Sequence, residues 1–166
     1  MLRHSDSEID DVFGRLTQLV GTELFREDIS LSHSDIRKYC IATGVSRPEH
    51  VDRKAALAAG FADVTAPPSI FGALTMTKLH DRDQLQEDGV SAYLPLGNLG
   101  SVIAETELQF HELALAGEPI VMRRTITDVQ MKKGRTGRMI FSWHEARFTG
   151  LAGNLKAVFS FVQVCR

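Results

Sequence analysis

The chain has 166 residues, of which 43% are hydrophobic and 24% charged, enough for one domain with a buried core. A formal net charge of −2 and an isoelectric point near 6.3 argue against a nucleic-acid-binding protein. No apolar run reaches membrane-spanning length, and the acidic N-terminal segment does not resemble a secretory signal. We therefore expect a cytoplasmic protein, with residues 1–166 forming a single domain.

An amphipathic helix is predicted at the N-terminus. Its apolar positions recur at helical spacing, at Ile9, Val12, Phe13, Leu16, Leu19 and Val20. Ser5 and Glu8 have the spacing of a capping box, and Gly21 stands where a C-terminal cap belongs. A short strand is expected over residues 24–31.

Two further short helices are predicted before the middle of the chain. Ser32 precedes Asp35 by three residues, as in an N-terminal cap, and the residues that follow on one face are Ile36, Tyr39 and Cys40. The second of these helices covers residues 53–59, and Gly60 closes it.

The next helix is unusual because it has no charge between its start and Lys78. Pro67 and Pro68 open it, and proline is tolerated in a first turn because amides there lack helical partners. A helix without a polar stripe is buried on nearly all sides, so we expect a central helix over residues 68–78. Residues 80–100 form a long loop in this prediction.

The second half of the chain is predicted to consist of strands. Residues 102–110 alternate between apolar and polar side chains, and three further strands cover residues 120–131, 139–148 and 155–164. A basic segment at residues 132–138 connects two of them. The order of elements predicts an α+β fold, with an antiparallel sheet wrapped around the central helix.

One segment carries a family resemblance. It reads T-G-V-S-R-P-E-H-V-D over residues 43–52, and is followed by Ala55, Ala56 and the pair Gly60-Phe61. It resembles the hydratase motif of MaoC-like hot-dog enzymes, roughly S-G-D-x-N-P-x-H-x-D, then alanines and a G-F pair. The match runs without a gap over residues 43–69, and the closing strands fit the family outline. The resemblance implies a hot-dog fold.

The resemblance also implies an activity, the hydration of a trans-2-enoyl thioester or the reverse dehydration. In the family an aspartate and a histidine hold and deprotonate the water and protonate the alpha carbon. An amide N–H at the start of the central helix stabilises the enolate oxygen, aided by the helix dipole. No separate cofactor and no metal are expected, because coenzyme A or a carrier protein arrives as part of the substrate.

Carried over residue by residue, the motif departs from the family at three positions. The histidine falls on His50, but the aspartate position holds Val45 and the asparagine position holds Arg47. The glycine whose amide would stabilise the enolate is replaced by Pro68, which has no N–H. Each loss is expected to reduce the rate by about 100-fold or more. The A-P-P opening resembles the N-terminal, non-catalytic half of double hot-dog hydratases and their stand-alone subunits.

Several residues have two interpretations. His50 is either a surviving general base, with Asp52 as a candidate partner, or a solvated or supporting histidine left after the aspartate was lost. An apolar side chain at Val45 would admit an acyl tail, and the substrate-facing set would also include Pro68, Ser69 and Phe71. Lys132, Lys133, Arg135 and Arg138 either bind coenzyme A phosphates or form a solvated turn.

Three functions stay open at this level. The first is a substrate-channel subunit that pairs with a second hot-dog subunit carrying the intact motif. The second is a self-sufficient homodimeric hydratase or thioesterase that uses His50, and the third is a non-enzymatic acyl-thioester binding module. Cys40 and Cys165 fit no metal-binding spacing and are expected to be reduced, packed thiols.

Overall fold

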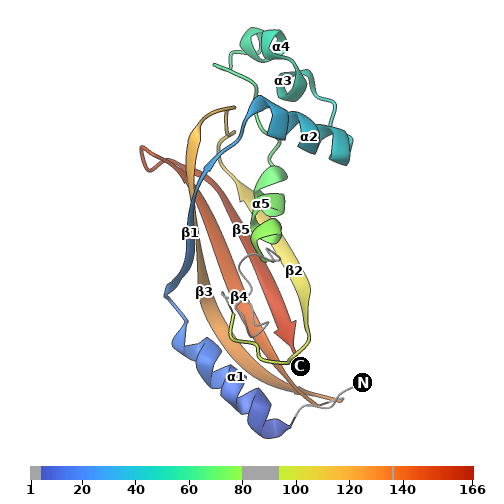
Figure 1. The fold of residues 1–166 in the computed structure, drawn as a ribbon, viewed down its shortest axis with the longest axis vertical. Coiled ribbons are helices and arrows are strands. Elements are labelled where there is room, and N and C mark those ends of the chain that lie inside the picture. Colours follow the sequence, from blue (N-terminus) through green and yellow to red (C-terminus); the bar gives the residue numbers. More distant parts are fainter. Residues whose placement is uncertain (1–4, 80–93, 136) are drawn as a thin grey trace.

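The computed structural model describes residues 5–79, 94–135 and 137–166, whose arrangement is shown in Figure 1. The elements follow the order α1 (Asp6–Gln18), β1 (Glu23–Ser30), α2 (His33–Thr43), α3 (Pro48–Val51), α4 (Arg53–Ala58), α5 (Ile70–Leu79), β2 (Ser101–Phe110), β3 (Pro119–Gly134), β4 (Gly137–Gly150) and β5 (Leu155–Cys165). Of the predicted loop over residues 80–100, only residues 94–100 belong to the described part.

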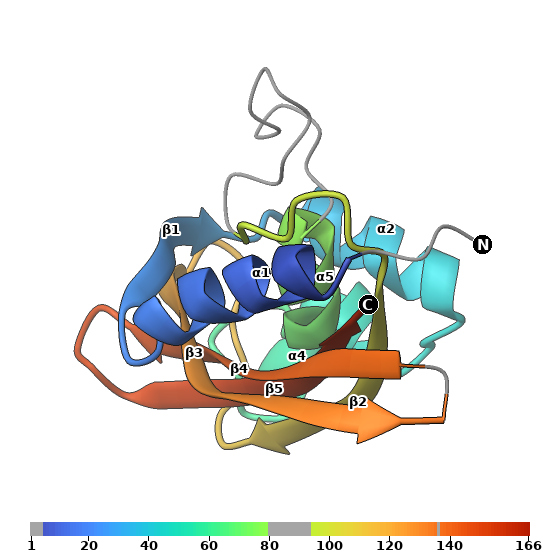
Figure 2. The ribbon, with the colours of Figure 1, turned by 90° about the horizontal axis from the view of Figure 1, so that it is seen from below.

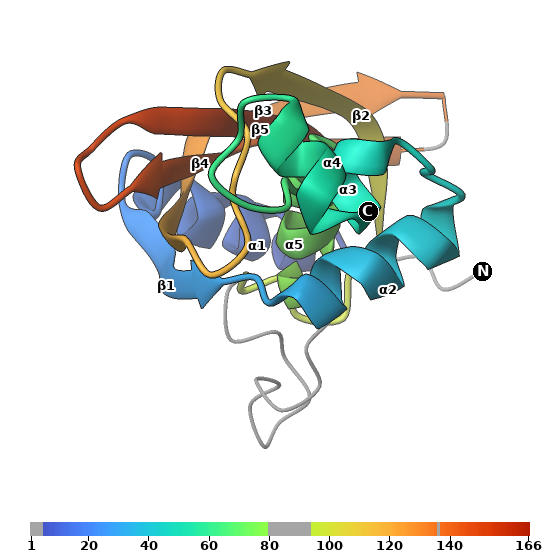
Figure 3. The ribbon, with the colours of Figure 1, turned by 90° about the horizontal axis from the view of Figure 1, so that it is seen from above.

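The five strands form one antiparallel sheet in the order β1-β3-β4-β5-β2. β3, β4 and β5 follow one another directly, whereas β1 and β2 join the two edges after longer connections. Seen along the long axis, the sheet curves around α5, while α1 lies beside it (Figures 2 and 3). The predicted α+β arrangement, an antiparallel sheet around a central helix, is confirmed.

Helix α5 packs into the curve of the sheet through apolar side chains. Ile70 is 3% exposed and Phe71 is fully buried, with its ring centroid 4.8 Å from that of Phe148 on β4. Gly72 lets the helix approach β5, because a Cβ atom there would lie 3.0 Å from the ring of Phe159. Ile70, Phe71 and Thr75 are buried, whereas Gly72, Ala73, Leu74 and Met76 are half-buried, so the predicted burial on nearly all sides holds only in part.

Two apolar cores lie under the same sheet, and we call them the main core and the second core. The main core is built around α5 and α2, with Ile36, Cys40, Ile70, Phe71, Met122, Phe148, Phe159 and Phe161 among its residues. The second core lies under α1 at the other end of the sheet, with Ile9, Val12, Leu16, Leu94, Leu99, Ile126, Ile140 and Cys165. Of the apolar face predicted for the N-terminal helix, Ile9, Val12 and Leu16 are buried and Phe13 and Leu19 are half-buried, whereas Val20 lies beyond the helix and is exposed.

The predicted helix caps agree with the structure except at one end. Ser5 and Glu8 form a reciprocal capping box at α1, and Ser32 makes the same arrangement at α2. The C-terminal cap of α1 is not Gly21, as predicted, but Leu19 in a right-handed conformation. Gly21 has a positive φ of 77° two residues later, so it turns the chain towards β1 rather than ending the helix.

The strands and two helices differ in detail from the sequence prediction. β3 and β4 pair as far as Gly134 and Gly137, so most of the predicted connection over residues 132–138 is strand. The four-residue helix α3 was not predicted, and α5 begins at Ile70 rather than at Pro68. No helix in the described part of the chain combines the length and apolar character that a membrane crossing requires.

Candidate functional site

The motif over residues 43–52 lies in the cluster of short helices α2, α3 and α4 at one end of the molecule (Figure 1). Gly44 ends α2 in a left-handed conformation, with φ 71°, and so redirects the chain into the motif. Val45 is half-buried and packs against the main core. Arg47 is the N-cap residue of α3, and its guanidinium lies 2.5 Å from the carboxylate of Glu49.

His50 lies on α3 and is 3% exposed. Its Nδ1 atom is 2.8 Å from the carbonyl oxygen of Thr65 and 2.8 Å from the hydroxyl oxygen of the same residue. A carbonyl oxygen only accepts, so Nδ1 carries a proton, and in the neutral form of the ring the lone pair is on Nε2. Thr65 in turn donates from its N–H and from its hydroxyl to the carbonyl of Glu49, at 3.1 and 3.2 Å. His50 is therefore not the solvated residue considered above.

Asp52, the candidate partner of His50, has another task. Its Oδ1 atom accepts hydrogen bonds from the N–H groups of Lys54 and Ala55, at 2.7 and 3.0 Å. It is thus the N-cap of α4, where a carboxylate satisfies amides that lack a helical acceptor. The residue that orients His50 is Thr65, which lies fifteen positions away in sequence and which the motif itself does not contain.

Helix α5 begins five residues beyond Thr65, so the hydrogen bonds of Thr65 link His50 to the segment that leads into the helix. Ala66 donates to the carbonyl of Ala114 at 2.7 Å. The carbonyls of Pro67 and Pro68 accept from the first two helical amides, at 3.0 and 3.3 Å. Neither proline has an N–H, so the first amide that this turn could offer to an oxyanion belongs to Ser69, which is exposed.

The structure brings some of the predicted residues together and keeps others apart. Phe71 belongs to the main core, and Val45 packs against that core. The basic residues Lys132, Lys133 and Arg135 lie at the far end of the sheet, where the β3–β4 hairpin adjoins α1 (Figure 1). Within one chain they are therefore remote from the motif.

Two of the four basic residues also have contacts of their own. Lys132 Nζ lies 4.6 Å from the ring centroid of Phe141 and 5.3 Å from that of Trp143, as in cation–π pairs. Arg138 forms an ion pair with Asp10 of α1, which holds the pKa of that carboxyl below its usual value through a direct hydrogen bond. Lys133 and Arg135 are exposed.

A buried polar cluster that the sequence analysis did not single out lies on the inner face of the sheet, between the two cores. It consists of Arg124, Ser142, His144 and Gln163, each less than a tenth exposed. Arg124 donates to Nδ1 of His144 at 3.3 Å, so Nε2 of the ring is protonated and donates to the Ser142 hydroxyl at 2.8 Å. The Gln163 side chain donates to the Ser101 hydroxyl at 2.9 Å.

The environment of His144 keeps its imidazole neutral. Burial, with a further contribution from the Arg124 cation, lowers the pKa of His144 to about 3. The ring also stacks on Phe161, with centroids 4.5 Å apart and planes 5° from parallel. Glu145, the next residue, lies on the opposite face, as expected for neighbours on a strand. The sequence signal was a polar residue at two inward positions of β4, which only the strand register identifies.

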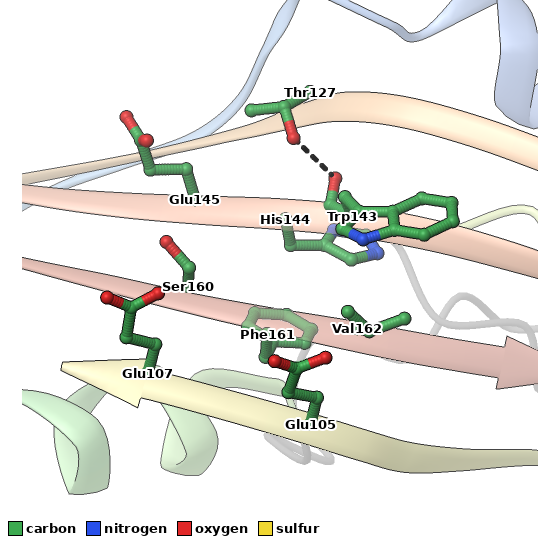
Figure 4. A pocket seen from close by; sticks show the side chains of 9 residues that line it. All are labelled: Glu105, Glu107, Thr127, Trp143, His144, Glu145, Ser160, Phe161 and Val162. Atoms are coloured by element: carbon green, nitrogen blue, oxygen red, sulfur yellow. Dashed lines mark hydrogen bonds between the residues drawn. The ribbon is translucent and has the colours of Figure 1, made fainter.

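The outer face of the sheet carries a shallow pocket of about 190 Å³ (Figure 4). Carboxylates of Glu105 and Glu107 on β2 and of Glu145 on β4 surround it, and Trp143 forms one wall. In the part of the chain that the structure describes, no three His, Cys, Asp or Glu side chains are grouped so that they could hold a metal ion. Cys40 and Cys165 are buried free thiols, and burial raises the pKa of Cys165 to about 11.

A central helix packed in the curve of a five-stranded antiparallel sheet defines a hot-dog domain, the fold shared by solved MaoC-like dehydratases and R-hydratases. Residues 18–155 match the model of the FAS1-like dehydratase domain region, and the chain belongs to this family.

Solved structures share the fold at low sequence identity. The C-terminally truncated HadBC complex of Mycobacterium tuberculosis, a 3R-hydroxyacyl-ACP dehydratase, is 18% identical with TM-score 0.69, over 90% of this chain and 98% of that one. The ChsH1–ChsH2 complex of the same organism is 20% identical with TM-score 0.70, over 96% and 92%. The R-hydratase PhaJ1 of Pseudomonas aeruginosa is 16% identical with TM-score 0.64, over 87% and 79%. No curated protein matches significantly.

Proposed function

We propose that this chain is a subunit of an enoyl-thioester hydratase or 3-hydroxyacyl-thioester dehydratase, and that it shapes the substrate channel beside a second hot-dog subunit with an intact motif. The observation that carries this proposal is the pair Val45 and Pro68. Hydration needs a group that holds water and a donor that stabilises the enolate. At the two positions where the motif provides them, this chain has an apolar side chain and an imide nitrogen without hydrogen.

The surroundings of Val45 support a channel rather than a catalytic centre. Val45 is half-buried and packs against the main core, which includes the fully buried Phe71, so an acyl tail entering there would meet apolar side chains. The named pairs in the solved structures, HadBC and ChsH1–ChsH2, show that domains with this fold occur in complexes of two different subunits. The substrate in this proposal is an acyl thioester of coenzyme A or of a carrier protein, and no other cofactor takes part.

One observation favours a second candidate, a self-sufficient homodimeric hydratase or thioesterase. Thr65 holds the ring of His50 so that Nε2 has a lone pair, which is the form a general base requires. What this candidate lacks is a carboxylate partner, because Asp52 caps α4.

The test is an assay of the purified chain with a short trans-2-enoyl-CoA, followed by absorbance of the conjugated thioester. The chain alone should show about 1% or less of the turnover of its complex with a hot-dog subunit that carries the intact motif, the scale of a lost base or oxyanion donor. Full turnover by the chain alone would establish the homodimeric enzyme instead. A stable complex without turnover would contradict both and favour a binding module.

A further inference from the structure

Strand β2 is an edge strand with unburied apolar side chains. It pairs with β5 on one side, and no strand of the described residues pairs with its other side. All its residues except Leu108 are exposed, including Val102 at 65%, Ile103 at 37% and Phe110 at 41%. A ten-residue edge of this kind offers unpaired N–H and C=O groups to any other strand. It therefore needs either a partner strand or side chains that prevent pairing with unsuitable strands.

The outer face of β2 carries charged side chains that can prevent such pairing. Glu105 stands opposite Val162 of β5, and Glu107 stands opposite Ser160, so both carboxylates project from the outer face, as Figure 4 shows. Glu107 accepts a hydrogen bond from Gln109 at 3.2 Å, and neither glutamate forms an ion pair with a Lys or Arg among the described residues. Two uncompensated negative charges therefore line the middle of the free edge.

Pairing of β2 with a second copy of itself would bring these charges together. In an antiparallel pair, directly opposite residues lie on the same face of the sheet. Neighbouring residues of one strand point to opposite faces, so a residue of one copy cannot stand opposite its neighbour in the second copy. The twofold axis that relates the copies must therefore pass at a residue and not between two residues. Axes through residues 105 and 106 give the fullest overlap of the strand over residues 101–110. The first places Glu105 opposite Glu105, and the second places Glu105 opposite Glu107 twice. Like charges directly opposite each other destabilise an antiparallel pair.

We propose that β2 binds the edge strand of a different hot-dog subunit, one that carries Lys or Arg opposite Glu105 and Glu107, and that these two glutamates suppress pairing with a second copy. That the partner is a second hot-dog subunit rests on the proposed function, and the charges that select this partner are the addition. The apolar side chains on the inner face of β2, Ile103 and Phe110, supply contact area that does not discriminate between partners, while the outer charges supply the discrimination.

Charge reversal of β2 tests this without knowledge of the natural partner. The double variant Glu105→Lys/Glu107→Lys has a basic edge strand, so it can stand in for a partner that carries Lys opposite Glu105 and Glu107. In sedimentation velocity, the wild type alone and the double variant alone should remain mostly monomeric. An equimolar mixture should form a dimer, with a dissociation constant about tenfold or more below that of either protein alone, because the two registers of fullest overlap now pair opposite charges. Added salt should weaken this mixed dimer.

A single substitution gives a second, independent readout. Glu105→Lys makes β2 self-complementary in the register centred on residue 106, so this variant alone should dimerise about tenfold more tightly than the wild type. Asp28→Lys, the same change on the exposed outer strand β1, is the matched control and should have no such effect.

Thermal unfolding followed by circular dichroism should show that the variants are folded, as expected for substitutions of exposed residues. If wild type and mixture self-associate equally, or if Glu105→Lys behaves like Asp28→Lys, the charge rule is wrong. That result would leave the proposed function standing, because turnover with the intact-motif subunit is measured separately.

Discussion

The geometry of His50 and the sequence of its motif indicate different roles for this residue. Its ring is buried and oriented as a general base would be. The aspartate position, however, holds Val45, and the position of the oxyanion donor holds Pro68, which has no N–H. Thr65, which binds it, also binds Glu49 and leads directly into the central helix. We infer that in this chain His50 mainly fixes the helix start, and that its removal costs stability more than rate.

We therefore predict that His50→Ala lowers hydratase turnover of the assembled complex by less than about tenfold, well under the usual worth of a general base. The same substitution should lower the free energy of unfolding by about 1–3 kcal/mol, because the Thr65 carbonyl and hydroxyl lose a buried partner. Steady-state kinetics and urea unfolding measure the two effects. Histidine and aspartate variants of the partner's motif serve as positive controls. A loss of turnover by His50→Ala as large as theirs, with assembly intact, would make this site catalytic.

His144 gives a prediction about pH. Its pKa lies near 3 in the folded chain and near 6.5 in the unfolded chain, so the unfolded state alone binds a proton as the pH falls between these values. Stability from this residue is complete above the higher value and decreases as the pH drops towards the lower one. Between pH 7 and pH 5 the free energy of unfolding should fall by about 2 kcal/mol for this reason.

Comparison with His144→Gln isolates the effect from other titrating groups. The variant has no imidazole to protonate, so its unfolding free energy should change less over the same pH interval, in urea titrations at matched ionic strength. Identical pH dependence in the two proteins would show that His144 is protonated in the folded state as well.

At the scale of elements, Lys156 on β5 holds the segment between β2 and β3 against the sheet. It is only 2% exposed, and its ammonium group lies 2.9 Å from the carboxylate of Glu112 and 2.5 Å from that of Glu118. The hydrogen bonds from Lys156 and Asn154 hold the pKa of Glu112 below its usual value. Glu118 also accepts from the N–H of Leu115 at 2.9 Å, which fixes the turn before β3.

Replacing this cation should be costly. Lys156→Met keeps the unbranched apolar part of the side chain but leaves the two carboxylates without their cation, so we expect a loss of about 2–4 kcal/mol in the free energy of unfolding. Lys38→Met, on an exposed face of α2, is the control and should change it by less than about 0.5 kcal/mol. Chemical denaturation measures both, and equal effects in the two variants would rule out a structural role for the cluster.

At the scale of the whole molecule, the features that could be predicted are those that depend on residues close together in the sequence. The capping boxes at Ser5 and Ser32 depend on residues three apart, and the burial of α5 follows from its composition. The link between His50 and Thr65 and the contact between Arg124 and His144 could not be predicted, because both require the register of segments distant in sequence. The exposure of β2 also escaped prediction, since alternation shows which residues share a face but not whether anything covers it.

The strand order has a consequence for how the chain folds during synthesis. β5 lies between β4 and β2 in the sheet, although β2 precedes it by more than forty residues and β5 is the last strand made. β1 likewise waits for β3, since Glu23 pairs with Thr125. Such non-local pairings give a high contact order and slow folding. The apolar helix α5 therefore leaves the ribosome before four of the five strands that enclose it, β2 to β5, and it is during this interval that the nascent chain is most exposed to aggregation and most dependent on chaperones.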